Sequence, residues 1–443
     1  MDMAAPPAVD SVGKKSADDG GALAARLGDF DAQRIPTVDL SQPAQVVLGQ
    51  IRAAADHGGP GFFYLINHGV SQQTLDECIA AAHRFFTSTP EEKMAHAKRC
   101  RVPDDAGGSI PESLRGRKAV GGKGYVPPGV EGAYQKDAAS DVRPESEIAS
   151  GKRNTRESFT FRYPCRDGAG GALGQPGGAE GAGRSIEEQP YCAGGRDGYA
   201  AWRRRWADAR GLPADGRPGA QELELLAAAS RFFFLEPNPW PEGFKPAVAN
   251  YFDAMRGLAR TMMGHFERLL RDTEEGLRDG ALAADLGMCT FNITHYPAAA
   301  GRDPTSFGIS DHTDWELFTL LYPAYLSKTH LDLCGSGDVA LDDAEPPEVA
   351  FTGLEVWFQG AWVQVPHRRG TIIVNQGEML SRLSSGRFPA PVHRVANSTG
   401  RERYSLVSFW APDFDVALPD PAQGTIPVGE HYLARNQFLE IAP

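Results

Sequence analysis

The segment Asp311-His312-Thr313-Asp314-Trp315 carries two potential metal ligands, and a third, His393, follows 79 residues after Asp314. Side chains two positions apart in a strand point to the same face, so His312 and Asp314 are predicted to bind one ion together while Thr313 points away. Two imidazoles and one carboxylate leave the other coordination positions of a metal open, as is typical of non-haem Fe(II) centres. The sequence therefore predicts an iron site formed by His312, Asp314 and His393.

A second motif, Arg403-Tyr404-Ser405, begins ten residues after His393. Strand spacing places the guanidinium of Arg403 and the hydroxyl of Ser405 on one face. The planar fork of an arginine matches the geometry of a carboxylate, so this pair predicts a site for an organic acid. Taken alone, the His-x-Asp motif also fits a solvated loop with a hydrogen-bonded histidine, and the second motif favours the metal site.

Further segments carry a resemblance to a known family. These segments are residues 34–40, 61–70, 237–241 and 374–380. Together with the two motifs, they make the chain resemble the 2-oxoglutarate- and Fe(II)-dependent dioxygenases, in the branch that resembles isopenicillin N synthase. The resemblance covers roughly residues 33–100, 120–163, 235–325 and 352–440. It implies a mainly β fold with α elements, in which a double-stranded β-helix, or jelly roll, forms the core behind an N-terminal α/β region.

Carried over to this chain, the resemblance implies that His312, Asp314 and His393 bind iron. It implies that Arg403 and Ser405 bind the distal carboxylate of 2-oxoglutarate. Tyr296 joins this cofactor-binding set because residues 292–297 read Asn-Ile-Thr-His-Tyr-Pro where the family often has Arg-x-Asn-Tyr-Tyr-Pro. A threonine stands in place of the asparagine, so the contact with the near carboxylate is expected to differ. The implied cofactors are Fe(II), 2-oxoglutarate and dioxygen, and ascorbate stays open as a reductant.

The implied activity is oxidation of a small organic molecule in specialised metabolism, by hydroxylation, desaturation or ring closure. The expected substrate contacts are Phe159, Phe161, Trp315 and Phe409. Two alternatives stay open. Oxidases of the same fold that use no 2-oxoglutarate also have an Arg-x-Ser at this place, and a binding protein without catalysis can share the fold. Retention of all three metal ligands and of the Arg-Ser pair argues against the binding protein.

Composition excludes other classes of function. The 443 residues include 45 Lys and Arg against 57 Asp and Glu, a formal net charge of -12, which argues against nucleic acid as a partner. No apolar stretch approaches the roughly 20 residues that span a bilayer, and the first 30 residues lack the apolar core of a secretory signal. The expected location is therefore cytoplasmic, with a small-molecule substrate, no membrane and no obligate protein partner. Six cysteines without a CxxC motif favour free thiols over zinc or disulfides.

The chain is expected to divide into four parts: a disordered tail at 1–31, an N-terminal dioxygenase region at 32–163, a Gly-rich flexible insertion at 164–221, and helices with the jelly-roll catalytic core at 222–443. An acidic loop is expected at 324–350 within the last part. Apolar periodicity predicts helices over 46–56, 74–86 and 244–277 and a final helix over 430–439. Strands are predicted over 62–66, 290–296, 316–322, 353–358, 371–375 and 404–409. Four further histidines are expected to be hydrogen-bonded core or surface residues rather than ligands: His265, His295, His330 and His367.

Overall fold

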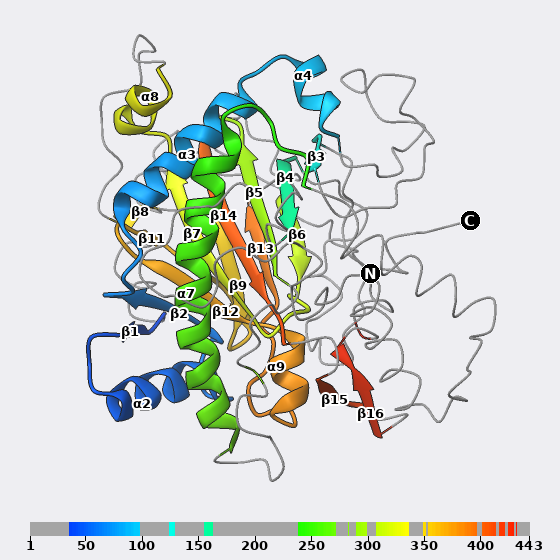
Figure 1. Ribbon diagram of the computed structural model, residues 1–443. Helices are drawn as coiled ribbons and strands as arrows, with labels where there is room; N and C mark the ends of the chain where they lie inside the picture. Colours follow the sequence, from blue (N-terminus) through cyan, green and yellow to red (C-terminus); the bar gives the residue numbers. More distant parts are fainter. Residues whose placement is uncertain are drawn as a thin grey trace, which may run out of the picture.

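Two β-sheets lie face to face in the computed structural model of the chain (Figure 1). The structure describes residues 35–97, 124–128, 155–162, 238–271, 282, 289–298, 307–335, 349–350, 353–396, 401–412, 416–420, 424–428 and 431. The predicted tail at 1–31, the insertion at 164–221, the acidic residues at 336–348 and most of the final helix lie outside these residues. No helix among the described residues is long and apolar enough to cross a membrane.

The larger sheet has eight strands in the order β1-β2-β12-β7-β14-β5-β4-β3. Their bounds are β1 Thr37–Asp39, β2 Phe62–Ile66, β12 Ile372–Gln376, β7 Phe318–Tyr325, β14 Arg403–Trp410, β5 Thr290–Tyr296, β4 Glu157–Arg162 and β3 Gly124–Val126. Neighbouring strands are antiparallel, except that β1 and β2 run parallel. The apolar run of β2 is buried on both faces, because helices cover one side of the sheet and the second sheet covers the other.

The smaller sheet has four antiparallel strands in the order β10-β9-β13-β6. These are β10 Ala361–Gln364, β9 Leu354–Phe358, β13 His393–Ala396 and β6 Phe307–His312. Apolar side chains of both sheets form one core between them, with Phe62 and Ile373 from the larger sheet and Val356 and Val395 from the smaller. Two short pairs complete the β structure: β8 Val349–Ala350 with β11 His367–Arg368, and β15 Ala417–Asp420 with β16 Gly424–Pro427.

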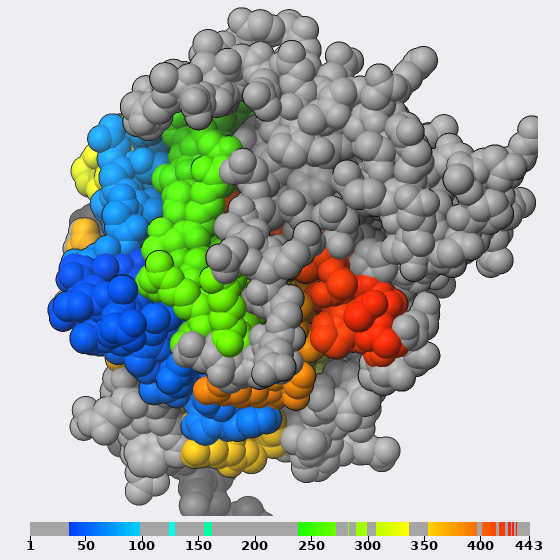
Figure 2. Space-filling view, turned by 60° about the horizontal axis from the view of Figure 1, so that its bottom comes forward, coloured from blue at the N-terminus to red at the C-terminus, as the bar shows by residue number. Residues whose placement is uncertain are grey.

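Helices α3 (Gln72–Phe86) and α7 (Phe244–Arg271) lie side by side across the outer face of the larger sheet (Figures 1 and 2). The α3 helix begins where the side chain of Ser71 accepts a hydrogen bond from the backbone of Thr74, a standard N-cap. The apolar stripe of α7 is buried against the sheet, as its helical spacing predicts. The shorter helices are α2 Ala44–Ala55, α4 Pro90–Ala95, α8 Lys328–Cys334 and α9 Glu378–Leu383.

Each central strand of the larger sheet has two unlike faces. On β5 and β14, Phe291 and Leu406 join the core under the helices, whereas Tyr296 joins the core between the sheets. Because side chains alternate along a strand, Asn292, Thr294 and Tyr296 share the inner face. By the same alternation the inner residues of β14 are Arg403, Ser405, Val407 and Phe409. This side of the larger sheet, which faces the smaller sheet, is the inner face.

This architecture confirms the predicted double-stranded β-helix with supporting helices. The structure differs from the expected acidic loop over residues 324–335, where β7 runs on to Tyr325 and α8 follows. Leu331 of α8 is buried and Nδ1 of His330 lies 2.9 Å from the hydroxyl of Ser327, so local apolar and capping residues order this part. Among the cysteines that the structure describes, Cys78 and Cys334 have free thiols.

Candidate active site

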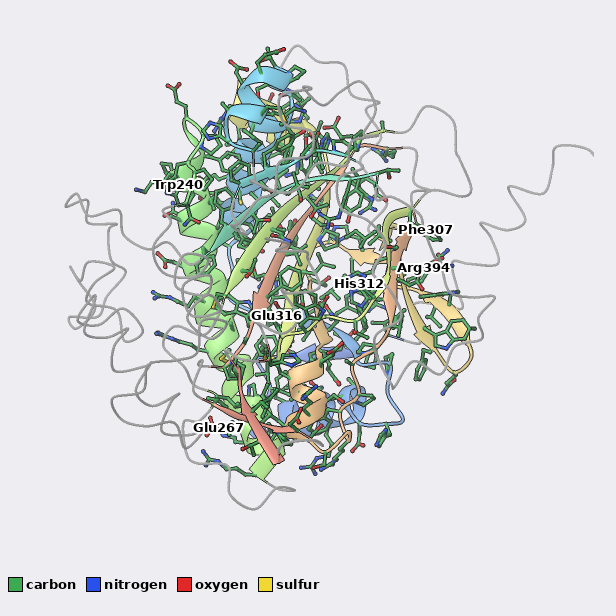
Figure 3. All side chains as sticks on the ribbon, turned by 90° about the vertical axis from the view of Figure 1, so that its right-hand side faces the viewer. Trp240, Glu267, Phe307, His312, Glu316 and Arg394 are labelled. Atoms are coloured by element: carbon green, nitrogen blue, oxygen red, sulfur yellow. The ribbon has the colours of Figure 1, made fainter. Side chains whose placement is uncertain are left out.

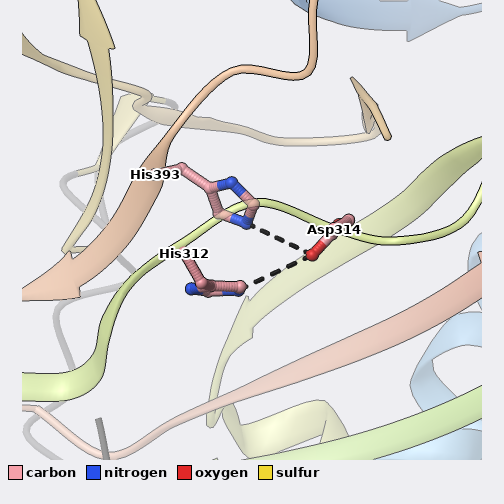
Figure 4. A group of neighbouring side chains, drawn as sticks. All are labelled: His312, Asp314 and His393. Carbon is pink, nitrogen blue, oxygen red and sulfur yellow. Dashed lines mark ion pairs between the residues drawn. The ribbon is translucent and has the colours of Figure 1, made fainter. Parts of the chain in front are cut away.

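Three predicted metal ligands meet between the two sheets. One ligand atom from each of His312, Asp314 and His393 lies within 4.8 Å of the others. The Nε2 atoms of both histidines are 3.6 Å from Oδ1 of Asp314 (Figure 4). Figure 3 places His312 on the side of the larger sheet away from α7, next to the smaller sheet that carries Arg394. The arrangement leaves two imidazole nitrogens and one carboxylate oxygen directed at a common point.

Both imidazoles are oriented by backbone carbonyls. Nδ1 of His312 lies 2.8 Å from the carbonyl oxygen of Ser310, and Nδ1 of His393 lies 3.2 Å from that of Pro391. Each Nδ1–H donates to its carbonyl, which leaves the Nε2 lone pair for a metal. Burial, together with the charge of His393, lowers the pKa of His312 to about 4. His312 is therefore a neutral imidazole at neutral pH, the form that binds metal.

Asp314 lies outside the strand that was expected to carry it. Strand β6 ends at His312, so strand spacing does not bring Asp314 beside it. The backbone at the start of α9 holds the segment instead, because the Glu378 amide donates to the Asp314 carbonyl over 2.9 Å. The pairing of His393 with His312 across β13 and β6 brings the two histidines together. The predicted set of residues converges, but by a different geometry.

Two residues that the sequence reasoning missed hold the Asp314 carboxylate. Asn375 donates to Oδ2 of Asp314 over 2.7 Å, and the Thr319 hydroxyl donates to the same oxygen. Burial alone would raise the pKa of Asp314, but the two histidines and these hydrogen bonds lower it. Oδ1 of Asp314 therefore points toward the two histidines. Asn375 lies in the segment 374–380 that carries the family resemblance, which was the available signal.

We expect Asn375→Leu to weaken metal binding by about 10- to 100-fold, because outer residues that orient a ligand have effects of that size. Anaerobic titration of the purified protein with Fe(II) measures this. Gln376→Leu is the matched control, since that neighbouring amide donates to the Ala55 carbonyl, away from the site. Equal metal affinities in both variants would contradict the role of Asn375.

The second motif forms a buried cationic site on the inner face. Arg403 is 3 % exposed, and its Cζ lies 3.6 Å from the ring centroid of Tyr296. Its Nη2 is buried without a hydrogen-bond partner among the residues that the structure describes. Ser405 is also buried and lies on the same face of β14. A buried guanidinium is costly without an anion, so these residues fit the carboxylate of 2-oxoglutarate.

The expected substrate contacts separate into two groups. The prediction that Phe159 and Phe161 contact the substrate is wrong, because both side chains point to the helix side of the sheet. The ring centroid of Phe159 lies 5.0 Å from that of Phe85, and the ring centroid of Phe161 lies 5.5 Å from that of Phe244. Their alternation with polar residues in β4 reflects burial under helices rather than contact with the site. Phe409 lies on the inner face and is half-buried, and Trp315 is half-buried directly after Asp314.

His295 is a hydrogen-bonded core histidine, as expected, and it joins two carboxylates behind the inner face. Nδ1 lies 2.7 Å from Glu157 and Nε2 lies 3.1 Å from Glu402. Lys93 and Tyr125 also donate to Glu157. Burial alone would lower the pKa of His295, but its bonds to both glutamates raise it. Burial would raise the pKa values of Glu157 and Glu402, yet their hydrogen bonds lower both.

The signs of these shifts predict a stability optimum near neutral or slightly acid pH. A raised histidine pKa stabilises the fold below the ordinary value of 6.5 and loses this effect as pH rises through the folded pKa. Lowered glutamate pKa values stabilise above 4.5 and lose their effect as pH falls. Between about pH 6 and pH 9, the thermal midpoint should fall less steeply in His295→Gln than in wild type. The exposed His57→Gln is the control, and equal slopes in His295→Gln and wild type would contradict the prediction.

Comparisons with known proteins match both halves of this architecture. The family model of the 2OG-Fe(II) oxygenase superfamily matches residues 348–412, and that of the non-haem dioxygenase in morphine synthesis N-terminal region matches residues 35–120. The 2-oxoglutarate-dependent dioxygenase citB of Monascus ruber is 25% identical over 428 residues, which cover 91% of this chain and 94% of citB. The dioxygenase traH of Penicillium crustosum is 28% identical over 200 residues, 42% of this chain and 51% of traH.

Solved structures share the fold. A full-length Neurospora crassa protein in complex with alpha-KG and thymine has a TM-score of 0.54 at 17% identity, over 92% of this chain and 97% of that one. An oxygenase from Caulobacter crescentus has a TM-score of 0.53 at 18% identity, over 92% and 99%. The fold and the family matches together define an oxygenase built on a double-stranded β-helix. The two family models and the named relatives support the 2-oxoglutarate- and Fe(II)-dependent oxygenase superfamily, whose cofactors are Fe(II) and 2-oxoglutarate.

Proposed function

We propose that this dioxygenase oxidises a small, partly apolar organic molecule of specialised metabolism at a metal held by His312, Asp314 and His393. Arg403, Ser405 and Tyr296 bind the cosubstrate 2-oxoglutarate. One observation carries the proposal. The three potential metal ligands and the buried Arg403, whose Nη2 has no hydrogen-bond partner among the described residues, all lie between the two sheets. Two relatives that match over about nine-tenths of the chain support the reaction class, because citB of Monascus ruber and tropC of Talaromyces stipitatus are both named 2-oxoglutarate-dependent dioxygenases.

The donor set fits Fe(II), since two imidazole nitrogens and one carboxylate supply three ligands and leave positions open. When bound, Fe(II) and 2-oxoglutarate supply the activation of dioxygen that oxidises a C–H bond. The protein holds the parts in place. Thr319 and Asn375 fix the Asp314 carboxylate, and backbone carbonyls fix both imidazole tautomers.

Arg403 supplies the charge that orients the cosubstrate. Its guanidinium is held from one side by the Tyr296 ring, and a β-carbon on Gly308 would lie 2.7 Å from that ring. A glycine at position 308 therefore lets the tyrosine lie close to β6. Because the guanidinium is buried, its hydrogen bonds to a carboxylate are stronger than they would be in water.

The test is conversion of 2-oxoglutarate to succinate by the purified protein with Fe(II) and ascorbate. The proposal predicts slow, Fe(II)-dependent succinate formation without a substrate and faster formation with the right small molecule. Oxygen consumption without loss of 2-oxoglutarate would favour an oxidase of the same fold that uses no 2-oxoglutarate.

A further inference from the structure

Part of the inner face beyond the cosubstrate residues is half-exposed and of mixed chemistry. Arg403 and Tyr296 are buried, but Thr290, Asn292, Val407 and Phe409 further along β5 and β14 are only half-buried. These four residues pair directly, Asn292 with Val407 and Thr290 with Phe409. A molecule entering from solvent therefore meets two apolar side chains, a hydroxyl and an amide on this part of the sheet.

This part of the inner face adjoins the metal ligands. Phe409 is paired with Thr319 on the neighbouring strand β7. The Thr319 hydroxyl donates to Asp314, one of the three proposed metal ligands. On the side away from β7, Phe409 is paired with Thr290 of β5, and Asn292 lies two positions further along β5. The amide thus lies one inner-face row away from the residues that hold Asp314.

Within the part of the chain that the structure describes, the side-chain oxygen of Asn292 has no hydrogen-bond partner. Its Oδ1 is shielded from solvent and accepts no hydrogen bond from any residue that the structure describes. In the strand register, Asn292 lies opposite Thr160 of β4 and Val407 of β14, and Val407 has no polar side-chain atoms. A shielded polar atom without a partner destabilises the fold, and such groups in native proteins call for an explanation. Binding of a ligand would explain the unpaired oxygen of Asn292, because the residue lies on the half-buried part of the inner face near the metal ligands.

We propose that Asn292 determines substrate specificity, by accepting through Oδ1 a hydrogen bond from a hydroxyl or N–H group of a substrate whose apolar part lies against Val407 and Phe409. This inference rests on the proposed function, since it deepens the description of the same site. A site built to hydrogen-bond a polar group rejects analogues that lack it, because the amide is then left unpaired.

The first test separates recognition from a structural role. Asn292→Leu keeps the approximate shape and removes both polar atoms. The thermal midpoint of the substrate-free variant stays the same or rises, because Oδ1 accepts no hydrogen bond from the residues that the structure describes and its burial is costly. An amide that held the strand would give a clear drop, and that result overturns the proposal. Ile293→Val is the control for disturbance of β5, since Ile293 is buried under the helices.

The second test measures selectivity with a matched pair of probes, 1-phenylethanol and ethylbenzene, which differ by a hydroxyl group that can donate to Oδ1. Probe binding to the anaerobic protein with Fe(II) and 2-oxoglutarate is followed by visible absorbance. Wild type prefers 1-phenylethanol by about three- to tenfold, the value of one hydrogen bond, and Asn292→Leu loses the preference. Equal preferences in both proteins, or none in wild type, overturn the proposal.

A third measurement separates the two proposals. The affinity for 2-oxoglutarate stays within about twofold of wild type in Asn292→Leu, because the register separates Asn292 from the Arg403–Tyr296 pair by four positions along β5. If wild type itself binds no 2-oxoglutarate, the proposed cosubstrate site fails, whatever Asn292 does.

Discussion

Replacement of His312, Asp314 or His393 by alanine is expected to abolish Fe(II) binding and turnover. Each variant removes one of three ligand atoms that lie within 4.8 Å of one another, and the remaining two cannot hold the ion in competition with water. The loss of affinity should exceed the roughly 10- to 100-fold effect of an outer residue such as Asn375. Metal analysis after anaerobic loading and a succinate assay measure the two effects.

The fold should survive these substitutions. Nδ1 of His312 and of His393 is bonded to a carbonyl only two residues earlier in the chain, so these hydrogen bonds do not tie distant segments together. Circular dichroism and thermal unfolding provide the check. The control is His367→Gln, a buried histidine of β11 outside the triad. Iron content and turnover near wild type in Asp314→Ala would contradict the metal assignment.

Arg403→Leu is expected to raise the dissociation constant for 2-oxoglutarate by about 10- to 150-fold, which corresponds to the roughly 1.5–3 kcal/mol of a charge-assisted hydrogen bond. Nη2 of the guanidinium is buried without a hydrogen-bond partner among the described residues, so it is available to a carboxylate of the cosubstrate. Equilibrium titration of the Fe(II) protein under nitrogen measures the constant.

Two comparisons sharpen the Arg403 result. Arg403→Lys keeps the charge but loses the planar fork, so its effect should fall between those of wild type and Arg403→Leu. Arg401→Leu is the control, because that guanidinium lies over the Tyr325 ring, 5.4 Å from its centroid. A dissociation constant for Arg403→Leu equal to that of Arg401→Leu would mean that Arg403 serves another purpose.

Local pattern predicted the elements that build the site. The run at 62–66 and the alternation at 290–296 coincide with β2 and β5, because strand burial leaves a direct mark on the residue order. The stripe that begins at Phe244 gave α7 for the same reason. Spacing also placed Arg403 and Ser405 on one face of β14.

Contacts between distant segments escaped prediction. The segment Glu157–Arg162 alternates polar and aromatic residues, but alternation alone does not say which side faces helices and which faces the second sheet. Asp314 is held by α9 and Asn375, which follow it by about sixty residues, so strand spacing gave the right partner for the wrong reason. The pairing of His295 with Glu157 and Glu402 likewise depends on packing of three separate strands or loops.

The most direct test of the central claim is visible absorbance of the anaerobic Fe(II) protein, with and without 2-oxoglutarate. If the triad holds iron and Arg403 holds the cosubstrate beside it, a weak charge-transfer band appears when 2-oxoglutarate is added and is absent in His393→Ala. Iron binding without such a band, or a band that His393→Ala retains, would contradict this account of the site.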